Sequence, residues 1–312
     1  MKLERIKCKP FERAKNLNIS ESYIIGCTGR KAVVLDKQLN IVHIVENLDY
    51  VYEALLSPDE TKMLLISTGN KFYIVDMQTF DMTRVTVKAP YNENLEGRGC
   101  WSHDGKSVWI PIQNMNSVLR RYWIDDLTHF QDYLKDKYHL DGIQRLEKSE
   151  RYFLTGYNRA ENNRRYFIYF DGVEFREYPL ENPAQLLALW AEVDEEQEIV
   201  TVAGTKDCWQ FTMEGKALQP ISHPAPKDKP DMFTVFREPI ACLDYVTKYD
   251  ISTCGRYAYL SSQSGFYVLD AKTNDVLASV DETYGVQNFE EIAADVIAIA
   301  TWSGVKLYRL VE

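Results

Sequence analysis

Short apolar stretches alternate with polar turns along the whole chain. The clearest example begins at Ser57, where the polar turn SPDET is followed by two apolar stretches, KMLLIS and KFYIVD, separated by TGN. These short stretches are rich in apolar, β-branched and aromatic side chains and are bounded by polar turns, which is typical of strands. The pattern therefore predicts an all-β fold made of short antiparallel strands.

The same succession of turn, strand, small turn and strand recurs along the chain. Repeats begin at Leu17, Ser57, Ser102, Leu146, Glu192, Ser252 and Glu291. They start 39 to 46 residues apart, except for one interval of 60 residues. Four-stranded blades of a β-propeller occupy about this length. Seven repeats use the whole chain of 312 residues, so we expect a single seven-bladed β-propeller domain over 1–312.

The last repeat indicates how the ring closes. Two strands follow its turn, near 296–302 and 305–311, and its outer strand is missing. The segment LERIKCK (Leu3–Lys9) alternates apolar and polar residues as a strand does. Pairing of this segment with the last blade would remove an open sheet edge. We therefore expect the N-terminal strand to complete the seventh blade.

Some of the repeats resemble a known family. The turns Ser57-Pro-Asp-Glu and Ser102-His-Asp-Gly, with FYIVD from Phe72 and FYVLD from Phe266 downstream, resemble WD40-like and YVTN-like β-propeller repeats. The resemblance covers nearly the whole chain, but the Gly-His and Trp-Asp dipeptides of WD40 blades are absent. It implies a propeller architecture of the looser class and no particular activity.

Two segments depart from the repeat. An insertion at about 221–248 contains the proline-rich run HPAPKDKP, which excludes a helix in its first half. It follows the fourth strand of its blade, which places it on the face that holds the channel mouth. The second departure is Asp126–Leu140, where Phe130, Tyr133 and Lys137 recur at three- and four-residue steps. This spacing predicts one short amphipathic helix.

Composition restricts the possible partners and the compartment. The formal net charge of -10 argues against sequence-blind nucleic-acid binding, which needs a field of Lys and Arg. We find no apolar run of membrane length and no apolar core of a secretion signal, so we expect no membrane association. The six cysteines are scattered without a C-x-x-C pair, as in proteins of a reducing compartment. These features together predict a cytoplasmic protein.

Motifs of catalysis are largely missing from the sequence. It contains no G-x-S-x-G, H-E-x-x-H or Walker A motif, and its five histidines show no metal-ligand spacing. Gly97-Arg98-Gly99 precedes a strand instead of a helix, so we interpret it as a loop that needs positive φ. We therefore predict no cofactor and no metal, and the catalytic residues, if there are any, remain unknown.

Charge is distributed unequally between the two faces expected of the propeller. The turns between first and second strands total -5, whereas those between second and third strands total +5. The second set surrounds the channel mouth, and a positive field there would attract acidic peptides or anionic ligands. The expected contacts are Arg30, Lys71, Arg98, Arg164, Lys206 and Trp302.

Two functions are compatible with this pattern. The first is a non-catalytic binding or scaffold module that docks an acidic protein, peptide or anionic ligand on the basic face. The second is a channel-sited hydrolase or lactonase-like enzyme that acts on a small anionic or sugar substrate. Its candidate residues are Glu53 and Lys248, near the starts of innermost strands.

Overall fold

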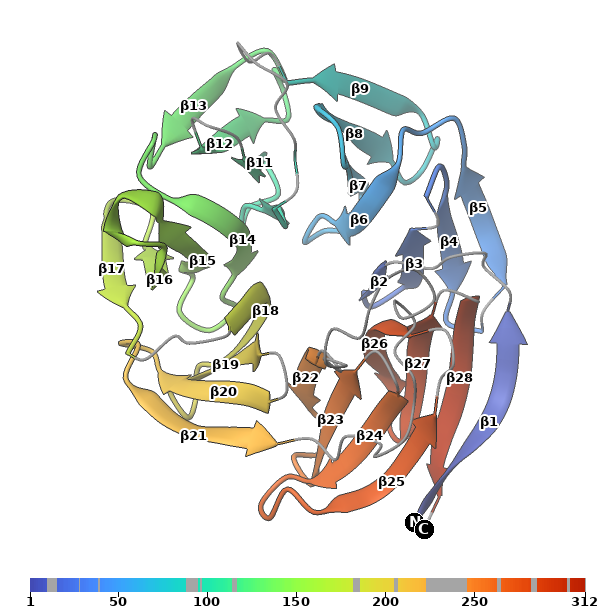
Figure 1. Cartoon of the computed structure of the whole chain (residues 1–312). Coiled ribbons are helices and arrows are strands. Elements are labelled where there is room, and N and C mark those ends of the chain that lie inside the picture. Colours follow the sequence, from blue (N-terminus) through green and yellow to red (C-terminus); the bar gives the residue numbers. More distant parts are fainter. Residues whose placement is uncertain are drawn as a thin grey trace, which may run out of the picture.

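Seven four-stranded antiparallel sheets are arranged in a ring around a central axis (Figure 1). The computed structural model describes residues 1–9, 16–27, 29–38, 40–87, 95, 97–113, 117–181, 186–204, 207–222, 246–262, 265–281, 285–301 and 304–311. Together these sheets form a seven-bladed β-propeller, which confirms the fold predicted from the repeats.

Each blade runs from an innermost strand at the channel to an outer strand at the rim. The innermost strands are β2 (Asn16–Ile19), β6 (Val51–Leu56), β10 (Cys100–Trp101), β14 (His139–Arg145), β18 (Leu186–Asp194), β22 (Val246–Ile251) and β26 (Val286–Ala293). The second strands are β3 (Tyr23–Cys27), β7 (Lys62–Ser67), β11 (Ser107–Ile112), β15 (Tyr152–Asn158), β19 (Ile199–Gly204), β23 (Tyr257–Ser262) and β27 (Val296–Thr301). The third strands are β4 (Ala32–Asp36), β8 (Lys71–Asp76), β12 (Val118–Trp123), β16 (Arg164–Phe170), β20 (Asp207–Thr212), β24 (Gly265–Asp270) and β28 (Gly304–Val311). The outer strands are β5 (Ile41–Val45), β9 (Met82–Thr86), β13 (Phe130–Tyr133), β17 (Phe175–Pro179), β21 (Ala217–Ser222), β25 (Val276–Asp281) and β1 (Lys2–Lys9).

The N-terminal strand closes the ring as predicted. Strand β1 pairs antiparallel with β28, from Lys2 opposite Val311 to Lys9 opposite Val305. The seventh blade thus combines three strands from one end of the chain with one from the other (Figure 1). This pairing covers the edge that β28 would otherwise expose.

Local hydrogen bonds explain why the repeat is visible in the sequence. In the turn after the innermost strand, the Ser57 hydroxyl accepts the Lys62 N–H at 3.0 Å, and Ser102 does the same for the Ser107 N–H at 2.9 Å. At the end of the third strand, an Asp76 carboxylate oxygen accepts the N–H groups of Gln78 and Thr79 in the next turn. Such side chains replace backbone partners in tight turns, so Ser and Asp recur at fixed places in the blades.

The core lies between the blades. One cluster joins Ile25 and Val34 of the first blade with Leu65 and Tyr73 of the second, and similar clusters fill the other blade boundaries. Both faces of each central strand are therefore covered, which explains the nearly continuous apolar runs of β7 and β8.

The helix predicted within Asp126–Leu140 is wrong. The segment contains the outer strand β13, which pairs with β12, and then a turn that leads into β14. Leu134 and Asp136 have positive φ values of 52° and 58°, which a right-handed helix does not allow. The edge of β12 satisfies the hydrogen bonds of this segment, and this tertiary pairing outweighs the helical spacing of its apolar residues.

Most of the insertion predicted at about 221–248 lies outside the described residues. Its first two residues end β21 and its last three begin β22. Within the described ranges, none of the helical segments is long and apolar enough to cross a membrane.

Candidate functional site

The predicted contact residues fall into three groups. Arg30 and Arg164 are exposed beside second-to-third-strand turns, and Lys71 begins the third strand β8. Arg98 is half-buried two residues before the innermost strand β10. Lys206 and Trp302 lie outside the described residues.

The second-to-third-strand turns share their face with the connections between blades. Backbone hydrogen bonds join the two sets, for example from the Leu48 N–H to the Arg30 carbonyl and from the Thr68 N–H to the Tyr50 carbonyl. We call this surface the channel-mouth face. Because the charge count from sequence considered only the turns, it left out the acidic residues that the connections bring to the same face.

Those acidic residues pair with part of the basic set. Lys71 lies 2.7 Å from an Asp49 carboxylate oxygen, and Lys31 lies 2.6 Å from Glu46. The Lys71 ammonium, followed by the Tyr73 hydroxyl, holds the pKa of Asp49 below its ordinary value. In contrast, Arg30 and Arg164 form no ion pair within the described part of the chain.

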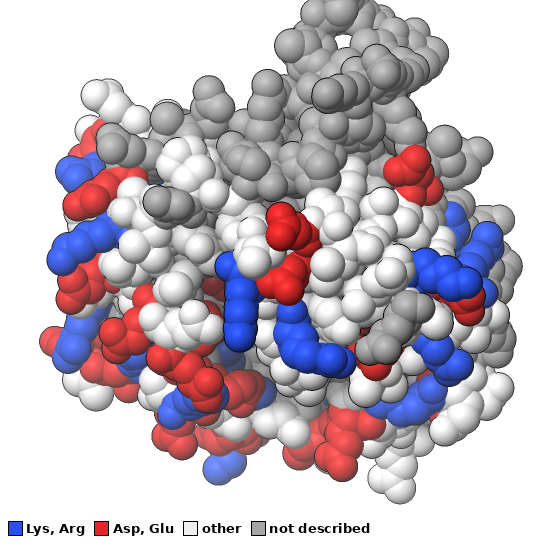
Figure 2. Space-filling view, turned by 90° about the horizontal axis from the view of Figure 1, so that it is seen from below, with Lys and Arg blue, Asp and Glu red and all other residues white. Residues whose placement is uncertain are grey.

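Basic and acidic side chains are interspersed on one side of the ring. Figure 2 views the ring from the side, and in its coloured part Lys and Arg side chains lie next to Asp and Glu side chains.

Long polar side chains of the innermost strands connect neighbouring blades. In the second, sixth and seventh blades the pairing register shifts just before Glu53, Lys248 and Asn288, the third residue of β6, β22 and β26. Such bulges redirect the following side chain. Each of these three residues bonds the backbone of the next blade, so we call them inter-blade clasps.

Arg98 occupies the corresponding position in the third blade. The Glu53 clasp accepts the N–H of Gly99, the residue after Arg98, at 3.0 Å. In the same way, the Lys248 clasp donates to the carbonyl of Phe289, the residue after Asn288, at 3.0 Å. Glu53, Arg98, Lys248 and Asn288 thus hold equivalent positions in their blades, and Arg98 is the cation at this position in the third blade.

The backbone of Arg98 is fixed against β14. Its N–H donates to the Asp141 carbonyl at 3.1 Å, and its carbonyl accepts the Ile143 N–H at 2.8 Å, which forms an isolated parallel bridge with Gly142. The glycine leaves the space beside Arg98 open, because an added Cβ at Gly142 would lie only 3.0 Å from the Arg98 Cβ.

The two positions that flank Arg98 have no room for a side chain, and both are glycines. An added Cβ would lie 2.7 Å from Pro111 at Gly97 and 2.7 Å from the Trp109 carbonyl oxygen at Gly99. Neither glycine has positive φ, so the interpretation of this motif as a loop that needs positive φ is wrong. The motif instead allows the chain to approach the third blade closely and presents Arg98 on a rigid backbone.

A small, partly open cleft lies beside Arg98. Its walls come from β14, β15 and β18, where the fourth and fifth blades meet. The lining consists of Arg98, Gly142, Ile143, Gln144, Phe153, Thr155 and Ala191. Arg98 is the only charged residue among them, and its guanidinium has no hydrogen-bond acceptor within the described residues.

Glu53 is a buried carboxyl group next to this arginine. Its side chain is 3% exposed, and burial raises its pKa to about 7, against the opposing effects of Arg98 and the Gly99 N–H. The position predicted from sequence, in an innermost strand, is confirmed. At neutral pH this group is only partly ionised, so Glu53 does not fully neutralise Arg98.

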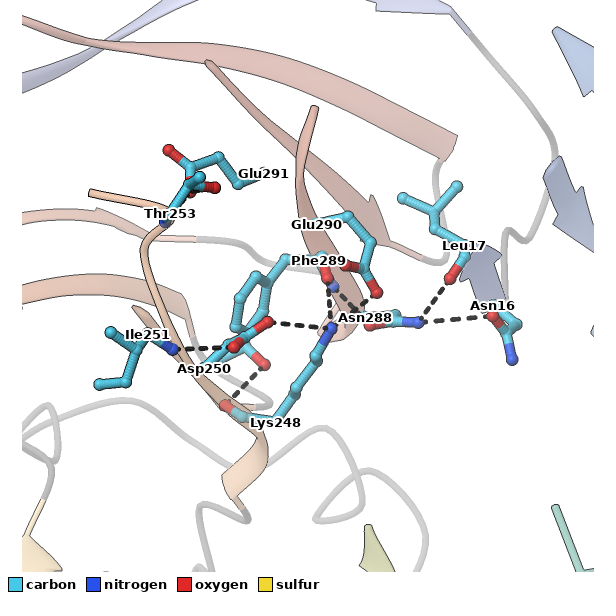
Figure 3. Close-up of polar contacts among 11 residues, drawn as sticks. Asn16, Leu17, Lys248, Asp250, Ile251, Thr253, Asn288, Phe289, Glu290 and Glu291 are labelled. Atoms are coloured by element: carbon cyan, nitrogen blue, oxygen red, sulfur yellow. Dashed lines mark hydrogen bonds and ion pairs between the residues drawn. The ribbon is translucent and has the colours of Figure 1, made fainter. Parts of the chain in front are cut away.

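A second charged cluster lies in the wall formed by β22 and β26 (Figure 3). The Lys248 ammonium is 2.6 Å from a Glu290 oxygen and 3.7 Å from an Asp250 oxygen. Burial alone would lower the pKa of Lys248, but Glu290 and Asp250 outweigh it and raise that pKa. Burial, followed by the charge of Asp250, raises the pKa of Glu192 to about 8. Lys248 is therefore a protonated cation with its donors in use.

Within the described part of the chain, no group of three or more His, Cys, Asp or Glu could hold a metal ion. Cys27, Cys100 and Cys254 form no disulfide, and burial raises the pKa of Cys27 and of Cys100.

The sequence analysis named Arg98, Glu53 and Lys248 as candidates. It missed the neighbouring groups that decide how these side chains are paired and charged. Asp250 and Glu290 lie in innermost strands close to the clasp positions, so the register of those strands was the signal that could have found them. No sequence signal indicated the open space beside Arg98, because that space depends on Gly142, which lies 44 residues further along the chain.

Comparisons with known proteins support the fold. No family model matches the chain, and no curated protein matches it. Among solved structures 1541 chains match. One is the β-propeller domain of Cps50 (Swd1) from Myceliophteria thermophila, 10% identical with a TM-score of 0.68, and the match covers 99% of this chain and 100% of that chain. At this identity the likeness shows the propeller fold alone, in agreement with the WD40-like repeats.

Proposed function

We propose that this propeller is a non-catalytic binding module that docks an acidic protein or peptide on its channel-mouth face. The observation that carries the proposal is the exposure and pairing of three arginines on this face. Arg30 and Arg164 are exposed without an ion pair in the described residues, and Arg98 is held rigidly beside a cleft with its donors open. Arginine binds carboxylates through two parallel hydrogen bonds, so unpaired arginines favour acidic partners.

The other predicted contact residues would contribute to binding in different ways. Lys71 would have to exchange its Asp49 partner for a group of the ligand, so we expect it to tune attraction more than affinity. Lys206 and Trp302 remain candidates from the sequence. A cytoplasmic location also belongs to the proposal, because Cys27, Cys100 and Cys254 form no disulfide.

A pull-down with charge-reversed variants tests this proposal. We would compare wild type with Arg30→Glu/Arg164→Glu, and with Lys106→Glu/Lys272→Glu as a matched control. The control makes the same charge change at exposed turns on the opposite face. A partner retained by wild type and by the control but lost by the arginine variant supports docking on the channel-mouth face. Equal capture by all three proteins contradicts it.

The channel-sited hydrolase remains a second candidate because of two carboxyl groups. Burial brings the pKa of Glu53 to about 7 and that of Glu192 to about 8, which suits a general acid or base at neutral pH. Lys248 favours this function less, since its amine is protonated and bonded. A screen of esters and lactones with wild type, Glu53→Gln and Glu192→Gln tests it, and activity that both variants retain would exclude these residues.

A further inference from the structure

The cleft beside Arg98 lies where the clasp position of the fourth blade has no side chain. Glu53, Lys248 and Asn288 each send a side chain to the next blade. In the fourth blade the residue after the register shift is Gly142, which has no side chain to send. The space that a clasp would fill is therefore open, and Arg98 lines it from the neighbouring blade.

The chemistry of the cleft fits one carboxylate group. Arg98 supplies a planar fork of donors, while Gln144 and Thr155 add polar groups to the lining. Ile143, Phe153 and Ala191 provide apolar surface for the methylene groups of an acidic side chain. Because Arg98 is the only charged lining residue, a single negative charge matches the site better than the two charges of a phosphate monoester.

We propose that this cleft binds one carboxylate of the docked partner, with the Arg98 guanidinium as its main donor. The inference rests on the proposed function, since it names the chemical group by which an acidic partner reaches into the channel. The site is built before the ligand arrives, because hydrogen bonds to Asp141 and Ile143 fix the Arg98 backbone.

Binding of a carboxylate to Arg98 should also make Glu53 take up a proton, because of the charges around Glu53. Arg98 is the cation that acts on it, and the neighbouring thiols of Cys27 and Cys100 stay protonated because burial raises the pKa of both. A carboxylate bound to Arg98 adds a negative charge and removes part of the attraction that Glu53 receives. The pKa of Glu53 therefore rises further above about 7 on binding, so affinity should fall as pH increases from 6 to 8.

Methyl NMR on the full chain tests the site directly. Ile143 and Ala191 line the cleft and carry the reporter methyl groups, while Ile25 lies in the core between the first two blades and serves as a reference. The probes are three short peptides: one with a single glutamate and both ends capped, its glutamine counterpart, and the glutamine peptide with a free C-terminal carboxylate. The first and third distinguish a side chain from a chain end as the source of the carboxylate.

The variants separate charge, geometry and proton uptake. Arg98→Gln removes the cation, Arg98→Lys keeps the charge but loses the fork, and Glu53→Gln keeps an acceptor for the Gly99 N–H while removing the titration. We expect saturable shifts of the Ile143 and Ala191 methyls with a carboxylate peptide and none with the capped glutamine peptide. Arg98→Gln should weaken binding at least tenfold, Arg98→Lys less, and Glu53→Gln should make affinity nearly independent of pH from 6 to 8.

Three results would overturn the inference. They are methyl groups that stay in place with both carboxylate peptides, shifts that persist in Arg98→Gln, and an affinity of wild type that does not change with pH. An unchanged Ile25 methyl confirms that a variant is folded. If the peptides do not bind the cleft but capture in the pull-down depends on Arg30 and Arg164, the docking function is supported and the carboxylate site is rejected. If the peptides bind the cleft but capture does not depend on these two arginines, the carboxylate site is supported and the docking function is rejected.

Discussion

Arg98 and Lys248 are cations at equivalent places in the ring, but their surroundings differ. Lys248 donates to the Phe289 carbonyl and to Glu290, with Asp250 at 3.7 Å. Arg98 faces a cleft and has no acceptor for its guanidinium within the described residues. The carboxyl group of Glu53, on which the charge of Arg98 acts, bonds the backbone of Gly99 instead.

The difference shows how one position in a repeated fold can serve structure or binding. A buried cation whose donors are all used holds two blades together, and a ligand would have to displace its partners. A cation with open donors on a fixed backbone is ready for an external anion. We therefore interpret Lys248 as structural and Arg98 as the recognition residue.

The largest expected effect comes from removing the strand that completes the seventh blade. Deleting residues 1–9 removes β1, exposes the edge of β28 and releases the seventh blade that carries Phe289 and Glu290. We expect the melting temperature to fall by roughly 10 °C or more.

Methyl NMR of the deletion variant would sharpen the comparison. Signals near β22 and β26 should change more than those of Ile143 beside Arg98. Equal changes at both places would contradict the independence of the two cation sites, and an unchanged melting temperature would show that closure contributes little stability.

Removing each cation compares the two sites directly. Lys248→Met leaves Glu290 and Asp250 without their buried partner, so we expect a loss of about 3–5 kcal/mol in the free energy of unfolding. Arg98→Met should cost no more than about 1 kcal/mol, because it breaks no hydrogen bond of the guanidinium. Urea unfolding at pH 7 measures both values. Equal losses would refute the division into structural and recognition cations, and Lys248→Met/Glu290→Gln should recover part of the loss.

Glu53 should make stability depend on pH. Its pKa is raised from 4.5 to about 7 in the folded protein, so the folded state holds a proton that the unfolded chain has lost. This contribution to stability is present below about pH 4.5 and is lost as pH rises to about 7. Glu53→Gln cannot ionise, and we expect it to gain on the order of 3 kcal/mol relative to wild type between pH 4.5 and 8.

Urea unfolding of both proteins at several pH values measures this gain. Glu192 and Asp141, whose pKa values are raised in the same direction, are common to both proteins and cancel in the difference. A difference that stays constant with pH would show that Glu53 titrates normally.

The smallest effect concerns a pair at the edge of the channel-mouth face. Lys71→Gln breaks the ion pair with Asp49, whose carboxylate keeps the Tyr73 hydroxyl as a donor at 2.8 Å. Because solvent screens this pair, we expect the free energy of unfolding to change by about 0.5 kcal/mol or less. Thermal unfolding at low and high salt measures it. A loss comparable to that of Lys248→Met would contradict the distinction between solvated and buried pairs.

The sequence alone determined the architecture of this protein. The number of blades, the order of strands and closure by the N-terminal strand follow from local signals that recur in each blade, such as Ser57 and Asp76 in their turns. Strand period and turn chemistry involve residues a few positions apart, so they are visible in a one-dimensional pattern. The segment Asp126–Leu140 shows the limit, because pairing with β12 overrode its helical spacing.

Only the tertiary structure decided what the charged residues do. Glu53 meets the Gly99 N–H 46 positions away, and Lys248 meets Glu290 42 positions away. The next blade supplies the carboxylate of Glu290 beside Lys248 but only a glycine, Gly142, beside Arg98, and this difference decides which cation has its donors bonded. Burial and charge act through space, and residue spacing along one blade does not contain that information.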